Sequence, residues 1–477
     1  MLQAYSPSMS GLPISIPRAT QVEQLCADPL GFLAQNRSSF GEIFVIREAG
    51  PIFSRVADCN GAIAVFGPEH HQAVLSDIDL FGMPVSAAEY LSLPRNLINL
   101  NHGLHSMRGE QHSQHQRLLM RLLSERAIQD QHEAIRARFE TSVQGWRSGQ
   151  SIGLLSEMRQ LALQVSIPLL FGDNYPESSE LALLLQSYFQ FRREVASPLS
   201  PVGDDMREEL IALGSSLDQA LRRHIKWCNQ KSLDSADGLL TTLATMELET
   251  GGRVSADELV AHSNVLFVSS NEPIAVSLTW ILLILSQLPD LRLKLRRELE
   301  EASLADAGPT RCNFARLPLL DAVINESLRL LTPNALMVRV TTRPAVLCGV
   351  RLPERSEIVL CPFLAHRDAR RFPRPNEFLL SRWSGTKPSP FEYFPFGAGG
   401  HSCVGRHIAT YIIKAALAFL MPRCELVLTE DQEIDWRIHI MFMPRNEPIM
   451  TVTAPDVSTL IGGKLLGPVG ELISLDP

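Results

Sequence analysis

A long apolar stretch near the middle of the chain limits the fold more than any other feature of the sequence. Ser255 and Glu258 have the spacing of a capping box, and residues 259–288 then continue with few charges until a proline ends them. The stretch is long enough to cross a membrane, but Asn264 and the polar residues 269–272 interrupt it. We interpret it as a central helix buried inside a large helical protein.

A glycine-rich loop around Cys403 carries the strongest chemical signal. Residues 394–406 read Phe-Pro-Phe-Gly-Ala-Gly-Gly-His-Ser-Cys-Val-Gly-Arg and precede a helical segment at 408–421. A thiolate held in such a loop is one way to give a haem iron a strongly electron-donating axial ligand. Gly397 permits backbone angles that a Cβ disfavours, and Gly405 leaves room for a flat porphyrin against the next helix. Backbone N–H groups and the positive helix end are expected to keep the thiol ionised.

Haem ligation is one of several roles that the immediate sequence around this cysteine allows. Cys403 alone is compatible with a buried cysteine in a turn, or with a nucleophile paired with His401 or His407. A dinucleotide-binding loop is disfavoured, because Ser402 stands where the third glycine of that motif is required. The residues spaced around the cysteine decide between these interpretations.

The spacing of Phe396, Gly399, His401, Cys403 and Gly405 resembles the haem-thiolate signature of the cytochrome P450 monooxygenases. The resemblance implies a soluble, bacterial-type member that binds haem b, with Cys403 as the axial ligand of the haem iron. It also implies the fold of that family, which is mainly α with a small β region. In that fold a triangular helical prism holds the haem between the long central helix and the cysteine loop.

Further haem contacts follow from the same resemblance. The implied cofactor-binding residues besides the cysteine are His401, Arg339, His112, Phe396, Gly397 and Gly405. His401, Arg339 and His112 match family positions that contact a haem propionate, which is a natural use of a charged N–H donor. The family places an arginine four residues after His112, but here Gln116 stands there and Arg117 follows. Either Arg117 reaches round to the propionate or the site has one cation fewer.

The apolar pattern of residues 319–331 predicts an amphipathic helix with Glu326 and Arg329 on one face. Alone, such a pair is a common surface ion pair that contributes little. In the P450 family, a second arginine holds the equivalent pair beneath the haem, and Arg382 in residues 375–383 matches it. The resemblance therefore implies that these three side chains form a structural brace and not a catalytic centre.

The central stretch departs from the family above the iron. The family has Ala or Gly, Gly, any residue, Asp or Glu, and Thr, whereas this chain has Ser269, Ser270, Asn271, Glu272 and Pro273. The acid is kept and the threonine hydroxyl is lost. Because Pro273 has no N–H, we expect it to free the carbonyl group of Ser269 and to widen the turn over the iron.

We assign catalytic roles to Glu272, Ser269 and Ser270. Our hypothesis is that protons travel through Glu272, one of the serines, and either water or a substrate hydroxyl. An atypical enzyme that uses peroxide or rearranges an oxygenated substrate is the alternative. The serines could also be small residues that only pack against the haem. A non-enzymatic haem sensor is less expected, because a sensor rarely needs an acid over the iron.

Composition favours a soluble enzyme of one domain. No linker divides the 477 residues, so we expect a single catalytic domain over residues 1–454 and an apolar extension over 455–477 that packs on the body or on a partner. The net charge of −8 argues against nucleic acid as a partner. Eight scattered cysteines fit a reducing compartment. The N-terminal residues lack a charged segment followed by an apolar span, so we expect a cytoplasmic enzyme without a membrane anchor.

Substrate and partners are predicted only as classes. By resemblance, the residues that line the substrate pocket are Met83, Phe267, Leu336, Met337, Met441 and Phe442. Their apolar and adaptable side chains favour a lipophilic molecule of terpenoid, polyketide or fatty-acyl type, as in secondary metabolism. No electron-transfer module is attached, so a separate ferredoxin or flavodoxin-type protein is the expected electron donor.

Overall fold

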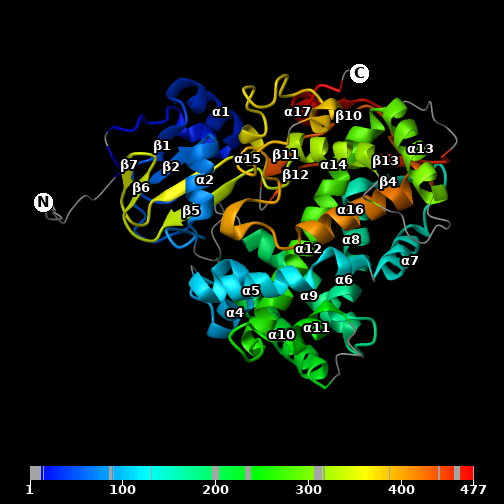
Figure 1. The fold of residues 1–477 in the computed structure, drawn as a ribbon, viewed down its shortest axis with the longest axis horizontal. Helices are drawn as coiled ribbons and strands as arrows, with labels where there is room; N and C mark the ends of the chain where they lie inside the picture. The colour runs from blue at the N-terminus through cyan, green and yellow to red at the C-terminus, as the bar shows by residue number, and fades with distance from the viewer. Residues whose placement is uncertain are drawn as a thin grey trace, which may run out of the picture.

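The computed structural model describes residues 12–475 except 14, 85–88, 90, 130, 196–202, 231–237, 306–313, 315–316, 386, 439–440 and 456–461. Helices form most of the molecule; the largest sheet lies on the left of Figure 1, and smaller strand pairings lie among the helices towards the right. The expected architecture, mainly α with a small β region, is confirmed.

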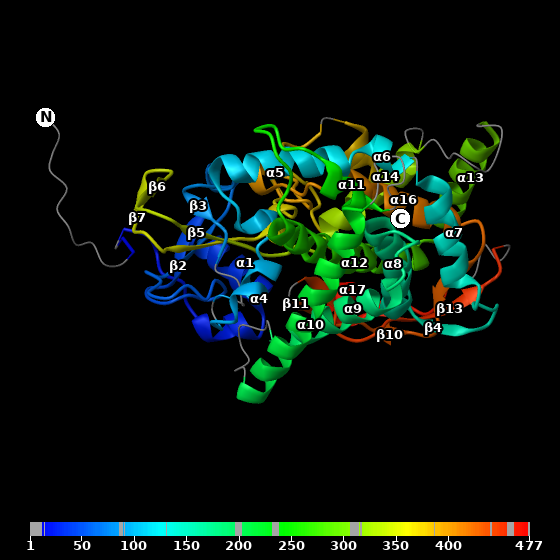
Figure 2. The same cartoon turned by 90° about the horizontal axis from the view of Figure 1, so that it is seen from below.

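Helix α12 (Ala256–Ser286) is the centre of the helical part. Its capping box is formed, since the Ser255 hydroxyl accepts the N–H of Glu258 at 3.3 Å and the Glu258 carboxylate accepts the N–H of Ser255 at 2.9 Å. The helix is apolar and long enough to cross a membrane, but 78% of its apolar window is buried inside the protein. It is therefore a core helix, and α8 (Leu154–Phe171) packs along it (Figure 2).

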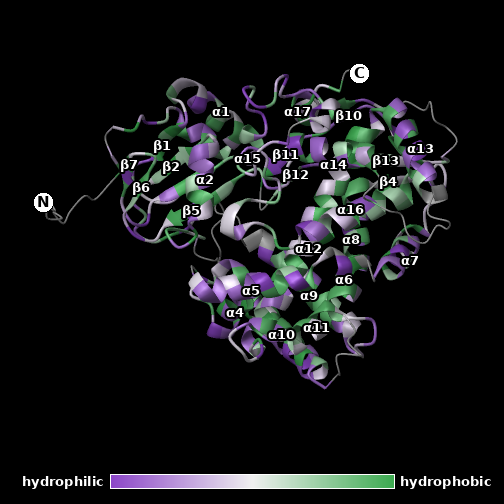
Figure 3. Ribbon diagram, viewed as in Figure 1, coloured by the Kyte–Doolittle hydropathy of each residue, from purple (hydrophilic) through white to green (hydrophobic). Residues whose placement is uncertain are grey.

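The other helices surround α12 in several groups. They are α1 (Pro29–Phe40), α2 (Pro68–Ser76), α4 (Arg95–Leu100), α5 (Gly109–Leu122), α6 (Glu125–Gln129), α7 (His132–Val143), α9 (Ser178–Val195), α10 (Asp204–Cys228), α11 (Leu239–Thr245), α13 (Pro289–Ala305), α14 (Pro318–Leu330), α15 (Pro362–Ala365), α16 (Arg406–Leu420) and α17 (Gly467–Glu471). Helix α5 buries one face that includes His112 and His115, while its outer face is largely hydrophilic (Figure 3). Such a pattern is that of an amphipathic helix at the protein surface.

The β region contains one five-stranded sheet and several smaller pairings. The large sheet has the order β1 (Ile43–Arg47), β2 (Ala62–Val65), β8 (Glu357–Leu360), β5 (Met337–Thr341) and β3 (Phe81–Gly82), in which only β2 and β8 are parallel. The smaller sheets are β4 (Ser151–Gly153) with β13 (Ile449–Thr453) and β9 (Glu425–Leu428), β6 (Ala345–Leu347) with β7 (Val350–Leu352), β11 (Trp436–Ile438) with β12 (Phe442–Pro444), and β10 (Gln432–Glu433) with β14 (Leu465–Leu466).

The described part of the C-terminal extension, residues 462–475, packs on the body of the protein. Strand β14 pairs with β10, and the N–H of Val469 donates to the carbonyl oxygen of Ile434 at 3.0 Å. Further along, Ser474 accepts the N–H of Phe378 at 3.0 Å. Val469 and Ile473 are buried and serve as core, whereas Leu466 is exposed.

Candidate active site

The loop before α16 holds Cys403 by its backbone. The N–H of Cys403 donates to the carbonyl oxygen of Phe396 at 2.9 Å. Gly397 and Gly399 have φ angles of +68° and +69°, a region that glycine enters at little cost. A Cβ on Gly399 would lie 1.9 Å from the carbonyl oxygen of Leu75, so the close approach of the loop to α2 requires glycine there.

The Cys403 side chain borders an internal space. The residue is exposed, yet burial by the groups around it raises the pKa of the thiol. Both are true of a group that faces an enclosed cavity. The Gly405 N–H and the Arg406 cation lower this pKa but do not outweigh burial. The thiol without a bound metal is therefore expected to be neutral, whereas a cation bound to the sulfur favours the thiolate, and the expected ionisation of the metal-bound sulfur stays a prediction.

Glycine at 405 keeps one side of the sulfur clear. A Cβ on Gly405 would lie 3.8 Å from the Cys403 Sγ and 3.4 Å from a methyl group of Ile408. Backbone strain does not require glycine here, because φ is −90°. What the missing Cβ provides is open space beside the sulfur, which suits a flat ligand that lies across the start of α16.

Nitrogen atoms without partners gather beside the loop. The rings of His112 and His401 meet edge to face with centroids 4.7 Å apart, and the His105 ring lies 6.4 Å from that of His401. Among the described residues, Nε2 of His112, Nδ1 of His401 and Nε of Arg339 are buried without a hydrogen-bond partner. Burial, together with the charge of Arg339, lowers the pKa of His401 to about 3. Buried donors that lack acceptors fit an anionic ligand such as a carboxylate.

Gln116 and Arg117 lie on α5 but supply no cation to this donor cluster. The Gln116 amide donates to the carbonyl oxygen of Gly400 at 2.7 Å and so ties α5 to the cysteine loop. Arg117 points outward, where it pairs with Glu249 at 2.9 Å and Glu110 at 3.4 Å. Arg117 therefore does not reach round to the cluster. His105 joins the cluster instead, and no motif in the sequence marked it.

The structure brings Glu326, Arg329 and Arg382 together. Glu326 and Arg329 are completely buried on α14 and form parallel contacts of 2.8 Å and 2.9 Å. Arg382, in a 3₁₀ turn at Leu380–Ser384, donates to the same carboxylate at 3.2 Å. The Leu379 N–H at 2.9 Å and the Trp383 indole at 3.0 Å complete its hydrogen bonds. A buried carboxylate is tolerated only when it is paired and hydrogen-bonded in this way.

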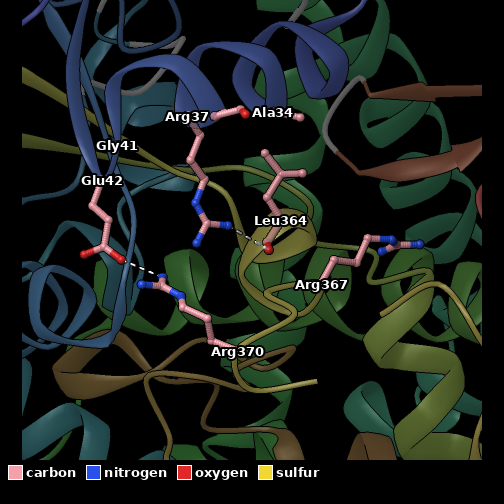
Figure 4. Close-up of a pocket in the computed structure, with 8 residues that line it drawn as sticks. Ala34, Arg37, Gly41, Glu42, Leu364, Arg367 and Arg370 are labelled. Carbon is pink, nitrogen blue, oxygen red and sulfur yellow. Dashed lines mark hydrogen bonds and ion pairs between the residues drawn. The ribbon is translucent and has the colours of Figure 1, made fainter. Parts of the chain in front are cut away.

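Ion pairs also fix the turn after α15. Asp368 contacts Arg370 and, from α1, Arg37, each at 2.6 Å. The hydrogen bonds from Arg370, and to a smaller extent from Arg37, lower the pKa of Asp368. Figure 4 shows Arg37, Arg370 and Glu42 around a hollow of about 350 Å³. Because Arg370 also pairs with Glu42 at 2.6 Å, the charges around this hollow are largely compensated.

Helix α12 presents a narrow open face to the interior. Within residues 259–286, all of which are described, Ser269 alone is exposed. Val265, Val268 and Pro273 are partly exposed, and their spacing places them on the same side of the helix as Ser269. We call these four residues the open face of α12. An exposed serine in an otherwise buried helix borders an internal space, as Cys403 does.

Pro273 does not interrupt the helix. α12 continues as one α-helix through Pro273, so the expected widening of the turn does not divide it. The two serines before it differ in their surroundings. The Ser270 hydroxyl donates to the carbonyl oxygen of Phe267 at 3.0 Å, within the helix, whereas Ser269 stands on the open face. Asn271 is tied to α8 through the Ser166 hydroxyl at 2.6 Å.

Glu272 is paired with an arginine that sequence reasoning missed. The Arg159 Nε, from α8, donates to Oε2 of Glu272 at 3.1 Å, and an Nη atom of the same guanidinium contacts Oε1. Glu272 is buried, but the Arg159 side chain is 27% exposed. The pair therefore extends from the interior towards the surface. Since 113 positions separate the partners, no local pattern could have revealed it.

The chain matches the family model of cytochrome P450 over residues 36–451. It belongs to the cytochrome P450 family. P450 enzymes hold haem b through a cysteine thiolate, and here Cys403, the space beside Gly405 and the donor cluster fit the iron, the ring and the propionates of that group. Haem b is therefore the cofactor of this site.

Curated relatives of this P450 come from bacteria and animals. It is 33% identical to cyclooctatin synthase of Streptomyces melanosporofaciens, over 40% of this chain and 42% of that protein. It is 28% identical to the mitochondrial sterol 26-hydroxylase of Oryctolagus cuniculus, over 62% and 57% respectively. Pentalenene oxygenase of Streptomyces avermitilis is 24% identical over 88% of this chain and 92% of its own. The first two matches thus span about half the length of those relatives.

Solved structures agree on the fold. Retinoic acid-bound cyanobacterial CYP120A1 superimposes with a TM-score of 0.77 and 20% identity, covering 93% of this chain and all of that one. The haem domain of cytochrome P450DA gives the same TM-score and identity over 92% of this chain and 98% of its own. At this identity the likeness shows the P450 fold alone.

The residues predicted to line the substrate pocket fall into two groups. Met83, Leu336 and Met441 are partly exposed. Phe267 and Phe442 are almost completely buried, and the Phe442 ring packs against Trp280 with centroids 5.5 Å apart. Met337, also largely buried, has its methyl group 3.8 Å from the position of a Cβ on Gly397 in the cysteine loop.

Proposed function

We propose that this P450 is a monooxygenase that hydroxylates or epoxidises a lipophilic small molecule. The observation that carries the proposal is the combination of an accessible thiol at Cys403 with buried, unpartnered donors on His112, His401 and Arg339. A cysteine in a turn, or a cysteine nucleophile, has no need of such donors. A haem held by its sulfur ligand and its propionates uses both.

Different residues of the chain have different roles around the cofactor. When bound, thiolate-ligated haem supplies the activation of dioxygen, with electrons from a partner, for the insertion of one oxygen atom into the substrate. Cys403 ligates the iron, and the donor cluster orients the propionates. The open face of α12 would line the space next to the bound cofactor. The buried side chains around it exclude water, which strengthens the hydrogen bonds that remain.

Proton delivery is assigned to Glu272 and Ser269. The two residues are three positions apart on α12, so they lie on neighbouring parts of one face. Glu272 holds Arg159, whose side chain reaches towards the surface, and Ser269 is exposed on the open face. Rotation of the Glu272 carboxylate, or a water between the two residues, then carries a proton from the Arg159 side to the Ser269 hydroxyl. Ser270 has a smaller part, because its hydroxyl is bonded within the helix.

The substrate class is proposed to be terpenoid, with polyketide and fatty-acyl compounds as related possibilities. Two relatives are named pentalenene oxygenase and sterol 26-hydroxylase, and both names describe oxygenation of a lipophilic molecule. The partly exposed Met83, Leu336 and Met441 give this chain an apolar and adaptable lining. These names also disfavour the alternative in which the enzyme uses peroxide or rearranges its substrate.

A separate ferredoxin or flavodoxin-type protein is proposed to supply the electrons. A hollow of about 440 Å³ lies on the side of the cysteine loop that carries Arg406, His407 and Lys414. Arg406 and His407 are exposed and follow Cys403 closely in the chain. Exposed cations beside the sulfur ligand suit an acidic donor protein.

The decisive experiment is the carbon monoxide difference spectrum of the reduced, haem-loaded protein beside Cys403→Ser. We expect a thiolate-type Soret band in the native protein and its loss in the variant. The same band in both proteins, or no haem binding, contradicts the proposal. Incubation of a lipophilic substrate with isotopically labelled dioxygen then separates monooxygenation, which incorporates the label, from rearrangement, which does not.

A further inference from the structure

A cation stands on α9, a helix that packs against both α10 and α12. Arg192 lies near the end of α9, beside the buried aromatic residues Tyr188 and Phe189. Its side chain is partly exposed, yet burial lowers the pKa of the guanidinium. As with Cys403, this combination describes a group that borders an enclosed space.

One hydrogen bond positions the Arg192 guanidinium. Its Nη1 atom donates to Oδ1 of Asn101, the residue that ends α4. The Nδ2 atom of Asn101 donates to the Leu97 carbonyl oxygen at 2.8 Å and to the Tyr188 hydroxyl at 3.1 Å. Both amide hydrogens are therefore used elsewhere, so the amide oxygen has to face Arg192. The arginine is held by a neutral group whose orientation is fixed.

Arg192 has no acidic partner in the part of the chain that the structure describes. Its neighbours are the amide of Asn101 and the phenol of Tyr188, and neither carries a negative charge at neutral pH. A guanidinium has five N–H donors, of which Asn101 takes one. By contrast, Arg223 on the adjacent helix α10 is paired with Glu177 at 2.7 Å and Glu180 at 2.9 Å. A cation whose hydrogen-bond partner is a neutral amide keeps donors that an anionic ligand can use.

The surroundings connect Arg192 to the haem site. α4 packs against both α10 and α12, and α9 packs against α10, so these helices form one group in Figure 1. Directly after Asn101, a Cβ on Gly103 would lie 2.7 Å from Val265 of the open face. His105 of the donor cluster follows four residues after Asn101. Four residues span at most about 14 Å, so Arg192 is within the length of one extended lipid of the propionate side.

We propose that Arg192, positioned by Asn101, anchors a carboxylate at one end of the lipophilic substrate. The apolar body of the substrate then extends along the open face of α12, and its other end is presented to the iron. This proposal rests on the proposed function, because it concerns the substrate of the same site. It narrows that substrate to an amphipathic acid, such as a terpenoid or fatty acid, and makes Arg192 a specificity-determining residue and not a catalytic one.

The test uses the haem-loaded full chain and paired probes. Saturated fatty acids of increasing chain length and farnesoic acid are titrated beside their methyl esters, and the substrate-induced shift of the Soret band gives each dissociation constant. We expect at least one acid to bind about tenfold or more tightly than its ester, because a charge-assisted hydrogen bond is lost in the ester. Equal binding of every pair, or no Soret shift with any acid, overturns the proposal.

Substitutions test whether Arg192 is the residue that makes acids bind more tightly than their esters. Arg192→Met removes the charge at similar length, and Asn101→Asp places a carboxylate against Arg192, so both should abolish the preference for acids while ester binding remains. Arg192→Lys should retain part of it, since the charge is kept but the planar fork is lost. Arg223→Met is the matched control, because that arginine is already paired on α10, and it should behave as the native protein. Retention of the preference in Arg192→Met contradicts the proposal.

The carbon monoxide spectrum keeps this test separate from that of the proposed function. All four variants should show the thiolate band of the native protein, because none of the changed residues belongs to the cysteine loop or to the donor cluster. If the native protein shows no such band, the proposed function has failed. If the band is present and acids are not preferred, only the assignment of Arg192 has failed.

Discussion

The two sides of the haem site are built in opposite ways. On the proximal side, which comprises the cysteine loop and the brace of Glu326, Arg329 and Arg382, buried charges are surrounded by direct hydrogen bonds. On the distal side, Ser269 is exposed on the open face of α12, and Arg192 on α9 is partly exposed with a neutral amide as its hydrogen-bond partner. The comparison shows that the protein fixes the position of the cofactor and leaves freedom where protons and substrate have to move.

Loss of the brace should have the largest effect. Glu326→Ala leaves Arg329 buried without its carboxylate, so we expect a loss of about 3–5 kcal/mol in the free energy of unfolding. Denaturant unfolding and haem content measure it. The control is Glu133→Ala, which removes an exposed carboxylate that pairs with Arg136 and should cost less than about 1 kcal/mol. If the two variants lose the same free energy of unfolding, the brace does not stabilise the proximal side more than an exposed ion pair does.

A change at Glu272 should lower the turnover rate more than it lowers the stability of the fold. Glu272→Gln keeps the size of the side chain and removes its proton-carrying role, so we expect the turnover rate to fall by about a hundredfold or more. The haem content and the thiolate band should be unchanged. Asp257→Asn alters an exposed carboxylate on the same helix and serves as the control. Unchanged turnover in Glu272→Gln rules out the proposed proton route.

Acid should weaken the contact between α12 and α5. His262 is buried on α12, and its Nε2 atom lies 2.9 Å from Nδ1 of His115. The other ring nitrogen of His115, Nε2, lies 3.3 Å from Oε1 of Glu258. Burial, with the charge of His115, lowers the pKa of His262 from 6.5 to about 3. Below pH 6.5, His262 therefore binds a proton in the unfolded chain but stays neutral in the folded protein. Stability is lost as the pH falls, by up to about 1.4 kcal/mol for each pH unit between the two values.

Denaturant unfolding at a series of pH values measures this loss. His262→Gln should reduce the difference in stability between about pH 7 and about pH 5 by about 1–2 kcal/mol, because the titrating group is gone. His407→Gln, which changes an exposed histidine, is the control and should leave the profile as it is. If both variants retain the full acid sensitivity, the loss arises elsewhere in the protein.

The smallest effect distinguishes the two serines. Ser269→Ala removes the hydroxyl on the open face, and we expect a several-fold decrease in the fraction of electrons that form product. Ser270→Ala removes a hydroxyl that is bonded to the Phe267 carbonyl group, so its effect should be smaller. Product formed per reduced cofactor consumed is the measurement. A larger effect of Ser270→Ala would show that the wrong serine has been assigned to proton delivery.

The sequence predicted the proximal side far better than the distal side. The cysteine loop and the capping box are marked by spacing within short segments, whereas the resemblance to the P450 family supplied the brace, in which Arg382 meets Glu326 across 56 positions of the chain. Arg159 and His105 were missed, because each meets its partner through tertiary packing and not through a nearby motif. The sequence also predicted a widened turn at Pro273; α12 continues as one α-helix through this residue, and the width of the turn stays a prediction.

Local sequence reveals only some of the factors that set the pKa of the Cys403 thiol. The glycine-rich loop and the following helix suggested an ionised sulfur, and their effect is present, since the Gly405 N–H lowers the pKa of Cys403. Desolvation is the larger effect, and its size depends on how many atoms from distant segments enclose the sulfur. Local sequence cannot give that number.

The packing of residues 462–475 also affects the order in which contacts beside the brace can form. Ser474 is bonded to the segment of Asn376 and Phe378, and the neighbouring Glu377 carbonyl group accepts a hydrogen bond from Arg329 at 3.0 Å. The contacts of Ser474 cannot form until residue 474 has left the ribosome. The segment beside the brace therefore gains its last support late in synthesis, after Glu326, Arg329 and Arg382 have all been made.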